Sequence, residues 1–122
     1  MLQEHIFFNA EKHLARIRIA DIMFVESKHR HVHIFCTDNV WDLRMSLDQL
    51  QTKLPSSMFV RIHRSYLVAL QHITFYMDSV VHLGDFELPV QHGKVNEFKD
   101  AIDIINRERR NRSKLLSKYK KL

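Results

Sequence analysis

The 122-residue sequence predicts a mainly β domain of antiparallel sheets, with one short internal helix and a second helix near the C-terminus. Most of the chain consists of short apolar runs rich in Val, Ile and Phe, and polar turn residues separate these runs. Only two segments show the helical spacing of apolar residues. Because the short strands follow one another directly, neighbouring strands are expected to pair as antiparallel hairpins.

The first half of the chain supplies the expected hairpins. Arg16 and Arg18 alternate with Ile17, which is the period of a half-exposed strand. The apolar run that begins at Ile22 is bounded by polar residues and is expected to form a central strand. A further hairpin is expected around the polar residues 37–39. The expected strands cover residues 4–9, 13–19, 22–26, 31–36 and 39–45.

Residues 46–54 predict the short internal helix. Ser46 can cap it, Gln49 stands at the capping-box position, and three leucines fall on one face. Pro55 ends it. From Lys94 the apolar spacing becomes helical again, which predicts a helix to about Arg107. The expected strands of the second half cover residues 65–70, 72–77, 79–83 and 85–90.

Composition restricts the class of protein. The length suits one domain, and no apolar run reaches the ~20 residues of a membrane helix. Cys36 is the only cysteine, so no internal disulfide can form and a cytoplasmic location is expected. The net charge of +5 is unevenly placed: residues 107–122 carry +7, and residues 1–106 carry −2. A basic surface on the body of the domain must therefore arise from local clusters.

The most informative stretch is FVRIHRSYLV, residues 59–68. Two strand-like apolar runs enclose Arg61, His63, Arg64 and Ser65, which are expected to share one short turn. All four side chains can donate hydrogen bonds to phosphates or base edges. The layout is typical of a β-scaffold that presents a basic loop to nucleic acid.

The order of motifs resembles the LytTR-type DNA-binding domain of bacterial response regulators. The chain reads IADIMFVES, KHRHVHIFC, MSLDQLQTKLPSSMFVRIHRSYLVAL and FELPVQHGKVNEFK in succession. The family pattern has an S-L-x-x-L helix, an F-x-R-x-H-R-S-Y-x-V-N block and a P-V-S-R block before a helix. The resemblance runs from about Ile6 to Ala101. It implies elongated antiparallel sheets whose loops, rather than a recognition helix, enter the major groove of double-stranded DNA.

The resemblance places DNA contacts in three clusters. The first is residues 28–31, the second is Arg61, Arg64 and Ser65, and the third is Gln91, His92 and Lys94. In the second, it implies a phosphate contact for Arg61 and a base or backbone contact for Arg64, while His63 is expected to face inward and bond a backbone carbonyl. In the third, Gln-His replaces the usual Ser-Arg, and Gln favours adenine where Arg would favour guanine. Ala69 stands where an Asn is usual. The predicted DNA-binding residues are Lys28, His29, Arg30, His31, Arg61, Arg64, Ser65, Gln91, His92 and Lys94.

The implied organisation is a DNA-binding domain over residues 1–106 and a basic tail over residues 107–122. The implied role is transcription regulation, as the output domain of a two-component response regulator or as a stand-alone regulator. Relatives are commonly fused to a phosphoacceptor receiver domain, and no receiver is expected within this length. The implied partners are paired DNA half-sites and a second copy of the chain, with no cofactor.

Other functions remain open from the residues alone. A β-module for single-stranded nucleic acid needs exposed aromatic side chains, but Phe7, Phe8, Phe35 and Trp41 are expected in the core. A protein-interaction or metal-binding module is the second alternative. His31 and His33 share a strand face, but no cysteine or fixed carboxylate nearby is expected to complete a metal site. No enzyme motif is recognisable, so no catalytic residue is expected.

Overall fold

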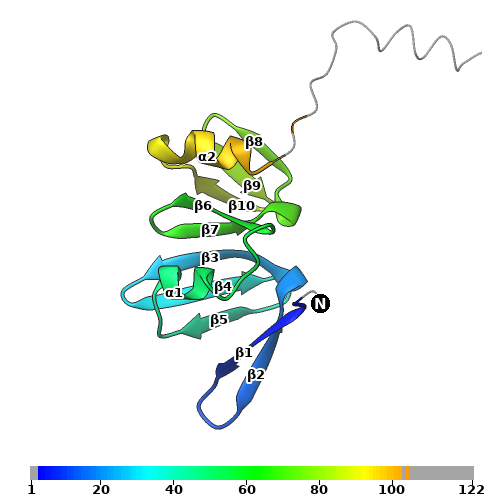
Figure 1. The fold of residues 1–122 in the computed structure, drawn as a ribbon, viewed down its shortest axis with the longest axis vertical. Helices are drawn as coiled ribbons and strands as arrows, with labels where there is room; N and C mark the ends of the chain where they lie inside the picture. The colour runs from blue at the N-terminus through cyan, green and yellow to red at the C-terminus, as the bar shows by residue number, and fades with distance from the viewer. Residues whose placement is uncertain (1–2, 103, 105–122) are drawn as a thin grey trace, which may run out of the picture.

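The computed structural model describes residues 3–102 and 104. Within this part of the chain, three antiparallel sheets follow one another along the long axis of the molecule (Figure 1). The largest sheet has five strands in the order β5-β4-β3-β7-β6 and lies in the middle, so the expected central position of β3 is confirmed. Its strands are β3 (Ile22–Lys28), β4 (His31–Cys36), β5 (Val40–Leu43), β6 (Phe59–His63) and β7 (Tyr66–Ala69).

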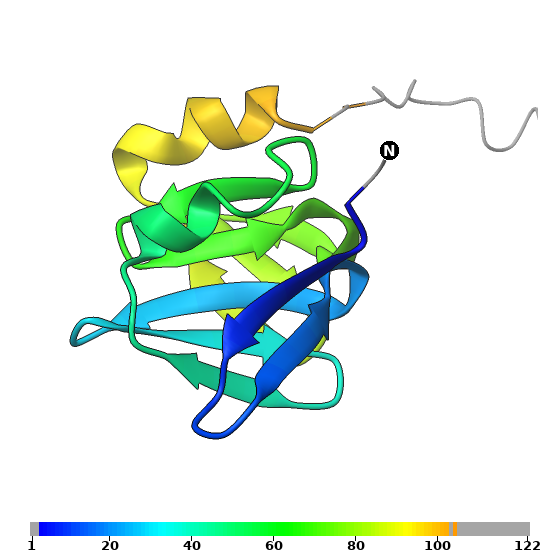
Figure 2. The same ribbon diagram turned by 60° about the horizontal axis from the view of Figure 1, so that its bottom comes forward.

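Two smaller sheets lie at either end of the central sheet. One is the hairpin of β1 (His5–Asn9) and β2 (Leu14–Arg18), which crosses in front of the central sheet in Figure 2. The other contains β8 (Phe75–Met77), β9 (Val80–Leu83) and β10 (Phe86–Pro89) in the order β10-β9-β8. The helices are α1 (Leu47–Gln51) and α2 (Val95–Asp100), with 3₁₀ turns at Ile19–Asp21, Leu70–His72 and His92–Lys94.

Strands β3, β6 and β7 of the central sheet are buried on both faces, because their alternating side chains enter two separate cores. In β3, Val25 points into the first core and Phe24 into the second. In β7, Leu67 points into the first core and Val68 into the second. This double burial explains why these strands are continuous apolar runs in the sequence, without the alternation of β2.

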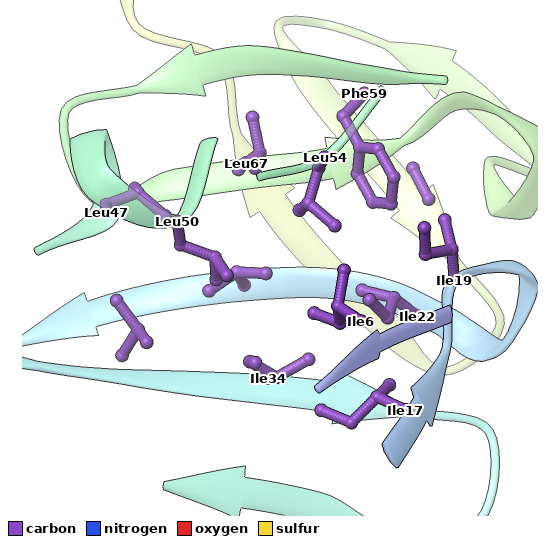
Figure 3. Packing of buried hydrophobic residues seen from close by; sticks show 13 residues of the cluster. Ile6, Ile17, Ile19, Ile22, Ile34, Leu47, Leu50, Leu54, Phe59 and Leu67 are labelled. Atoms are coloured by element: carbon purple, nitrogen blue, oxygen red, sulfur yellow. The ribbon is translucent and has the colours of Figure 1, made fainter. Parts of the chain in front are cut away.

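The first core lies between the central sheet, the β1–β2 hairpin and α1 (Figure 3). Leu47 and Leu50 of α1 point into it and are almost fully buried. The predicted capping box of α1 is confirmed: the Gln49 amide donates to Ser46 Oγ at 3.0 Å, and the Ser46 amide donates to Gln49 Oε1 at 2.9 Å. A five-residue helix is marginal alone, so this cap and its leucines hold it in place.

The second core joins the central sheet to the three-stranded sheet and α2. Phe98 is the fully buried side chain of α2, and its ring lies 5.0 Å from that of Tyr76. Val81 and Leu83 of β9 close the core from the other side. These contacts fix α2 against β6 and thereby place the residues that precede α2.

Three details of the expected fold are wrong. The first is the length of α2, which ends at Asp100 because Phe98 is its last fully buried side chain. Ile104 is 60% exposed, and the described residues 101, 102 and 104 are not helical. The expected end at Arg107 lies outside the described residues. The second is the segment 70–72, which forms a 3₁₀ turn where one strand was expected to end and the next to begin.

The third detail concerns Phe7, which is 65% exposed where a core position was expected. Ile6 and Phe8 point toward the first core, so the alternation of the strand turns Phe7 outward. The other three aromatic residues are half-buried against the two cores, as predicted. No helix in the described residues is long and apolar enough to cross a membrane.

Candidate nucleic-acid interface

The structure brings the three predicted clusters to one end of the central sheet, the left side of Figure 1. β3 and β7 are antiparallel, so the end of β3 lies beside the start of β7. The Ser27 amide donates to the Ser65 carbonyl at 2.8 Å, which joins the first cluster to the second. The backbone N–H of Gln91 donates to the Ile62 carbonyl at 2.7 Å, which joins the second cluster to the third.

The first cluster forms the tip of the β3–β4 hairpin. His29 and Arg30 are the two loop residues, and both have left-handed backbones with φ of 51° and 64°. A two-residue loop with two positive φ angles is a type I′ turn, which favours Asn-Gly. Side chains with a Cβ cost energy in this conformation. Both residues are exposed at the tip, as is Lys28 before them.

The second cluster is a shorter turn than expected. Arg61 and His63 belong to β6, and only Arg64 and Ser65 lie between β6 and β7. The reason is the burial of Val60 and Ile62 in the second core, which extends the strand through residue 63. Arg64 is exposed, and its guanidinium has no hydrogen-bond partner in the part of the chain that the structure describes.

Arg61 points from β6 toward α1 and is enclosed by acceptors. Its Nε donates to the His63 carbonyl at 2.9 Å, and its Nη2 donates to the Arg64 carbonyl at 2.6 Å. Its Nη1 donates to Asp48 Oδ1 at 2.8 Å and to Gln51 Oε1 at 3.1 Å. The Arg61 side chain is only 16% exposed. The sequence pattern assigns no role to Asp48 and Gln51. Their three-residue spacing puts both side chains on one face of α1, and this spacing was the signal that they could bind a common partner.

His63 has an internal role, although its partner differs from the expected one. Its Nδ1 accepts the Ser65 amide at 3.0 Å, where a bond to a carbonyl was expected. His63 therefore stabilises the turn at Arg64.

The third cluster contributes one side chain to the same turn. Gln91 Oε1 accepts the Arg64 amide at 3.0 Å. His92 is exposed at the start of the 3₁₀ turn, and Lys94 pairs with Glu97 at 3.3 Å. An open groove of about 440 Å³ runs beside the turn and is lined by Asp48, Gln51, Arg61, Arg64, Gln91, Lys94 and Glu97.

Histidines and carboxylates meet on the neighbouring sheet surface. His31 Nδ1 lies 2.7 Å from Asp42 Oδ1, so the predicted DNA contact of His31 would compete with this carboxylate. His33 lies between Asp42 and Glu26, at 3.7 and 3.6 Å. Tyr66 donates its hydroxyl to Glu26 at 3.2 Å, and burial together with this carboxylate raises the pKa of Tyr66.

Carboxylates therefore do lie beside the paired histidines, contrary to expectation. The described residues nevertheless contain no group of three side chains placed to hold a metal ion. Cys36 is half-buried at the end of β4, where desolvation and two nearby aspartates raise the pKa of its thiol to about 11. Ala69 is fully buried opposite Phe59, so this chain fills the usual Asn position with a small apolar side chain.

Fold and sequence together define the class of the protein as a β-type DNA-binding domain of transcriptional regulators. The chain belongs to the LytTr DNA-binding domain family, whose sequence model matches residues 12–103. A solved LytTr DNA-binding domain of a putative methyl-accepting/DNA response regulator from Bacillus cereus superposes with a TM-score of 0.72 at 18% identity. The superposition covers 84% of this chain and 99% of that one.

One curated relative is named as a transcriptional regulatory protein and another as a sensory transduction protein. The transcriptional regulatory protein YpdB of Escherichia coli is 30% identical over 93 residues, which are 70% of this chain and 38% of that protein. The sensory transduction protein LytT of Enterococcus faecalis is 25% identical over 107 residues, which are 83% of this chain and 44% of that protein. The chain thus spans less than half the length of these relatives.

Proposed function

We propose that the chain binds double-stranded DNA in a sequence-specific manner by inserting its loops into the major groove. The observation that carries this proposal is the left-handed His29–Arg30 pair, placed at the same end of the sheet as Arg64 and His92. Two large side chains occupy a turn whose backbone favours Asn-Gly. Backbone strain clusters at functional sites, and here the two strained residues are exposed and carry side chains that can donate hydrogen bonds to DNA.

The described helices are poorly suited to contact DNA bases, which favours the loops as the elements that read the sequence. α1 has five residues and α2 has six, and each turns its apolar side chains into a core. In the proposed complex, His29, Arg30 and Arg64 meet base edges, while Lys28 and Ser65 contact phosphates. Gln91, His92 and Lys94 flank the same surface. Arginine at a base edge favours guanine through its O6 and N7 acceptors.

The biological role proposed is transcription regulation in the bacterial cytoplasm, either within a two-component response regulator or alone. The names of the relatives support this role, since they are regulatory and sensory transduction proteins. Paired half-sites, a second copy on DNA and a receiver domain are further parts of the proposal. The basic segment 107–122 is proposed as a separate tail that adds charge-based affinity.

Single-stranded nucleic acid is the competing ligand. Among the described residues, the exposed phenylalanines Phe7, Phe75 and Phe86 do not form one stacking surface. Phe7 is on the β1–β2 hairpin, Phe75 stacks on His82, and Phe86 packs edge-on against Phe24. Bases could not stack on them in succession, which favours a duplex.

The test is a selection of bound sequences from random duplex DNA, followed by binding measurements. The selected duplex should bind more tightly than a scrambled duplex and than either of its single strands. Arg64→Ala should weaken binding to the selected duplex by about 1–3 kcal/mol and leave the scrambled duplex nearly unaffected. No enrichment in the selection, or equal affinity for the single strands, would contradict the proposal.

A further inference from the structure

We infer that Arg61 and Gln91 are positioning residues that fix the direction of the Arg64 side chain, and that Arg61 is not a phosphate contact. This inference rests on the proposed DNA-binding function and assigns a different role to Arg61 from the one that the family resemblance implies. It begins with the two backbone groups of Arg64. Gln91 Oε1 accepts the N–H at 3.0 Å, and Arg61 Nη2 donates to the carbonyl at 2.6 Å.

These two bonds fix the backbone conformation of Arg64. The N–H belongs to the peptide plane before the Cα atom, and the carbonyl belongs to the plane after it. Once both planes are held, φ and ψ are set, and the direction of the Cα–Cβ bond follows. His63 Nδ1 holds the next amide, that of Ser65, at 3.0 Å. The guanidinium of Arg64 therefore leaves the protein from a fixed base, which is what reading one base edge requires.

Most donors of Arg61 are already occupied. A guanidinium has five N–H groups. Four of them are used by the carbonyls of His63 and Arg64 and by the side chains of Asp48 and Gln51. The side chain is 16% exposed, and the Asp48 carboxylate opposes its charge. A DNA phosphate would have to displace these partners, whereas Arg64 presents its guanidinium without such competition in the described residues.

The planar fork explains why an arginine is needed at residue 61. Its Nε and Nη2 atoms reach two carbonyls of one turn while Nη1 reaches α1. Lysine has the same charge but a single nitrogen, which cannot bond both carbonyls with this geometry. Arg61→Lys therefore separates the two roles, since it preserves a point charge for phosphate and removes the brace of the turn.

The experiment compares a selected duplex with a scrambled duplex. Arg61→Lys is expected to lower affinity for the selected duplex about tenfold, the effect of no longer reading one base edge. Affinity for the scrambled duplex and the salt dependence of binding should stay at wild-type values. Arg16→Lys on the outer face of β2 is the matched control and should change neither. Thermal unfolding checks that each variant is folded.

A double-mutant cycle supplies the decisive result. In an Arg64→Ala background, Arg61→Lys should have no further effect on the selected duplex, because the side chain that it positions is gone. Gln91→Ala should behave in the same way and provides the test if Arg61→Lys does not fold. Additive effects would overturn the inference for either residue, since a direct contact acts without Arg64.

The salt dependence of binding gives a second test of the role of Arg61. Arg61→Ala would reduce the slope of log K against log salt by about 0.9 if Arg61 bound a phosphate, and should leave the slope unchanged if it positions Arg64. If wild-type protein shows no preference for any duplex, the proposed function itself fails. If wild-type protein is specific and the cycle is additive, only the positioning role fails.

Discussion

The left-handed turn at the tip of the β3–β4 hairpin predicts a trade-off. Substitutions that relieve its backbone should stabilise the domain and weaken DNA recognition. His29 and Arg30 have φ of 51° and 64°, where an L-residue with a Cβ is disfavoured by about 1–2 kcal/mol. His29→Asn with Arg30→Gly gives the turn the sequence that its backbone favours. Glycine also has more freedom in the unfolded chain, which offsets part of the gain. We expect a net stabilisation of about 1 kcal/mol.

The assay measures unfolding and binding on the same variants. For a domain of this size, about 1 kcal/mol raises Tm by roughly 4–8 °C. Binding to the selected duplex should weaken by about 1–3 kcal/mol for each base edge that is no longer read, with a smaller effect on a scrambled duplex.

The β8–β9 turn offers a control for the backbone effect. Ser79 has φ of 62° in a second two-residue turn, so Ser79→Gly relieves a similar conformation. This variant should gain stability like Arg30→Gly and keep wild-type DNA affinity. A stabilised β3–β4 variant with unchanged sequence preference would refute a role for His29 and Arg30 in recognition. No gain in Tm for either turn would refute the strain argument.

Four further predictions concern other parts of the chain. Phe98→Ala should lower the free energy of unfolding by about 3–5 kcal/mol, because Phe98 fills the second core; chemical denaturation would measure this. Cys36 ionises near pH 9.0 when unfolded and near 11 when folded, so stability should fall as pH rises through this interval, and Cys36→Ser should show a shallower fall. His92→Arg should tighten binding and shift selected sequences toward guanine at one position; an unchanged selection would contradict a base contact. Deleting residues 109–122 should preserve sequence preference and reduce the salt slope by about 0.9 for each phosphate that the tail neutralises; an unchanged slope would contradict the tail's proposed role.

The sequence by itself determined most of the strands and helices along the chain. Its alternating and continuous apolar runs placed the strands, since the period of burial is a local property of a strand. Ser46 and Gln49 predicted the start of α1 because a capping box involves neighbouring residues. The FVRIHRSYLV block identified the family, which the match over residues 12–103 confirms.

Only the tertiary structure decided what each polar side chain contacts. The basic residues at positions 61 and 64 look alike in sequence, but α1 packs on the face of the sheet to which Arg61 points. Arg61 therefore bonds Asp48 and its own turn, while Arg64 lies one residue beyond the strand and is exposed. Gln91 reaches the same turn from 27 residues away. Such contacts depend on how separate elements pack, and no local pattern of residues encodes that packing.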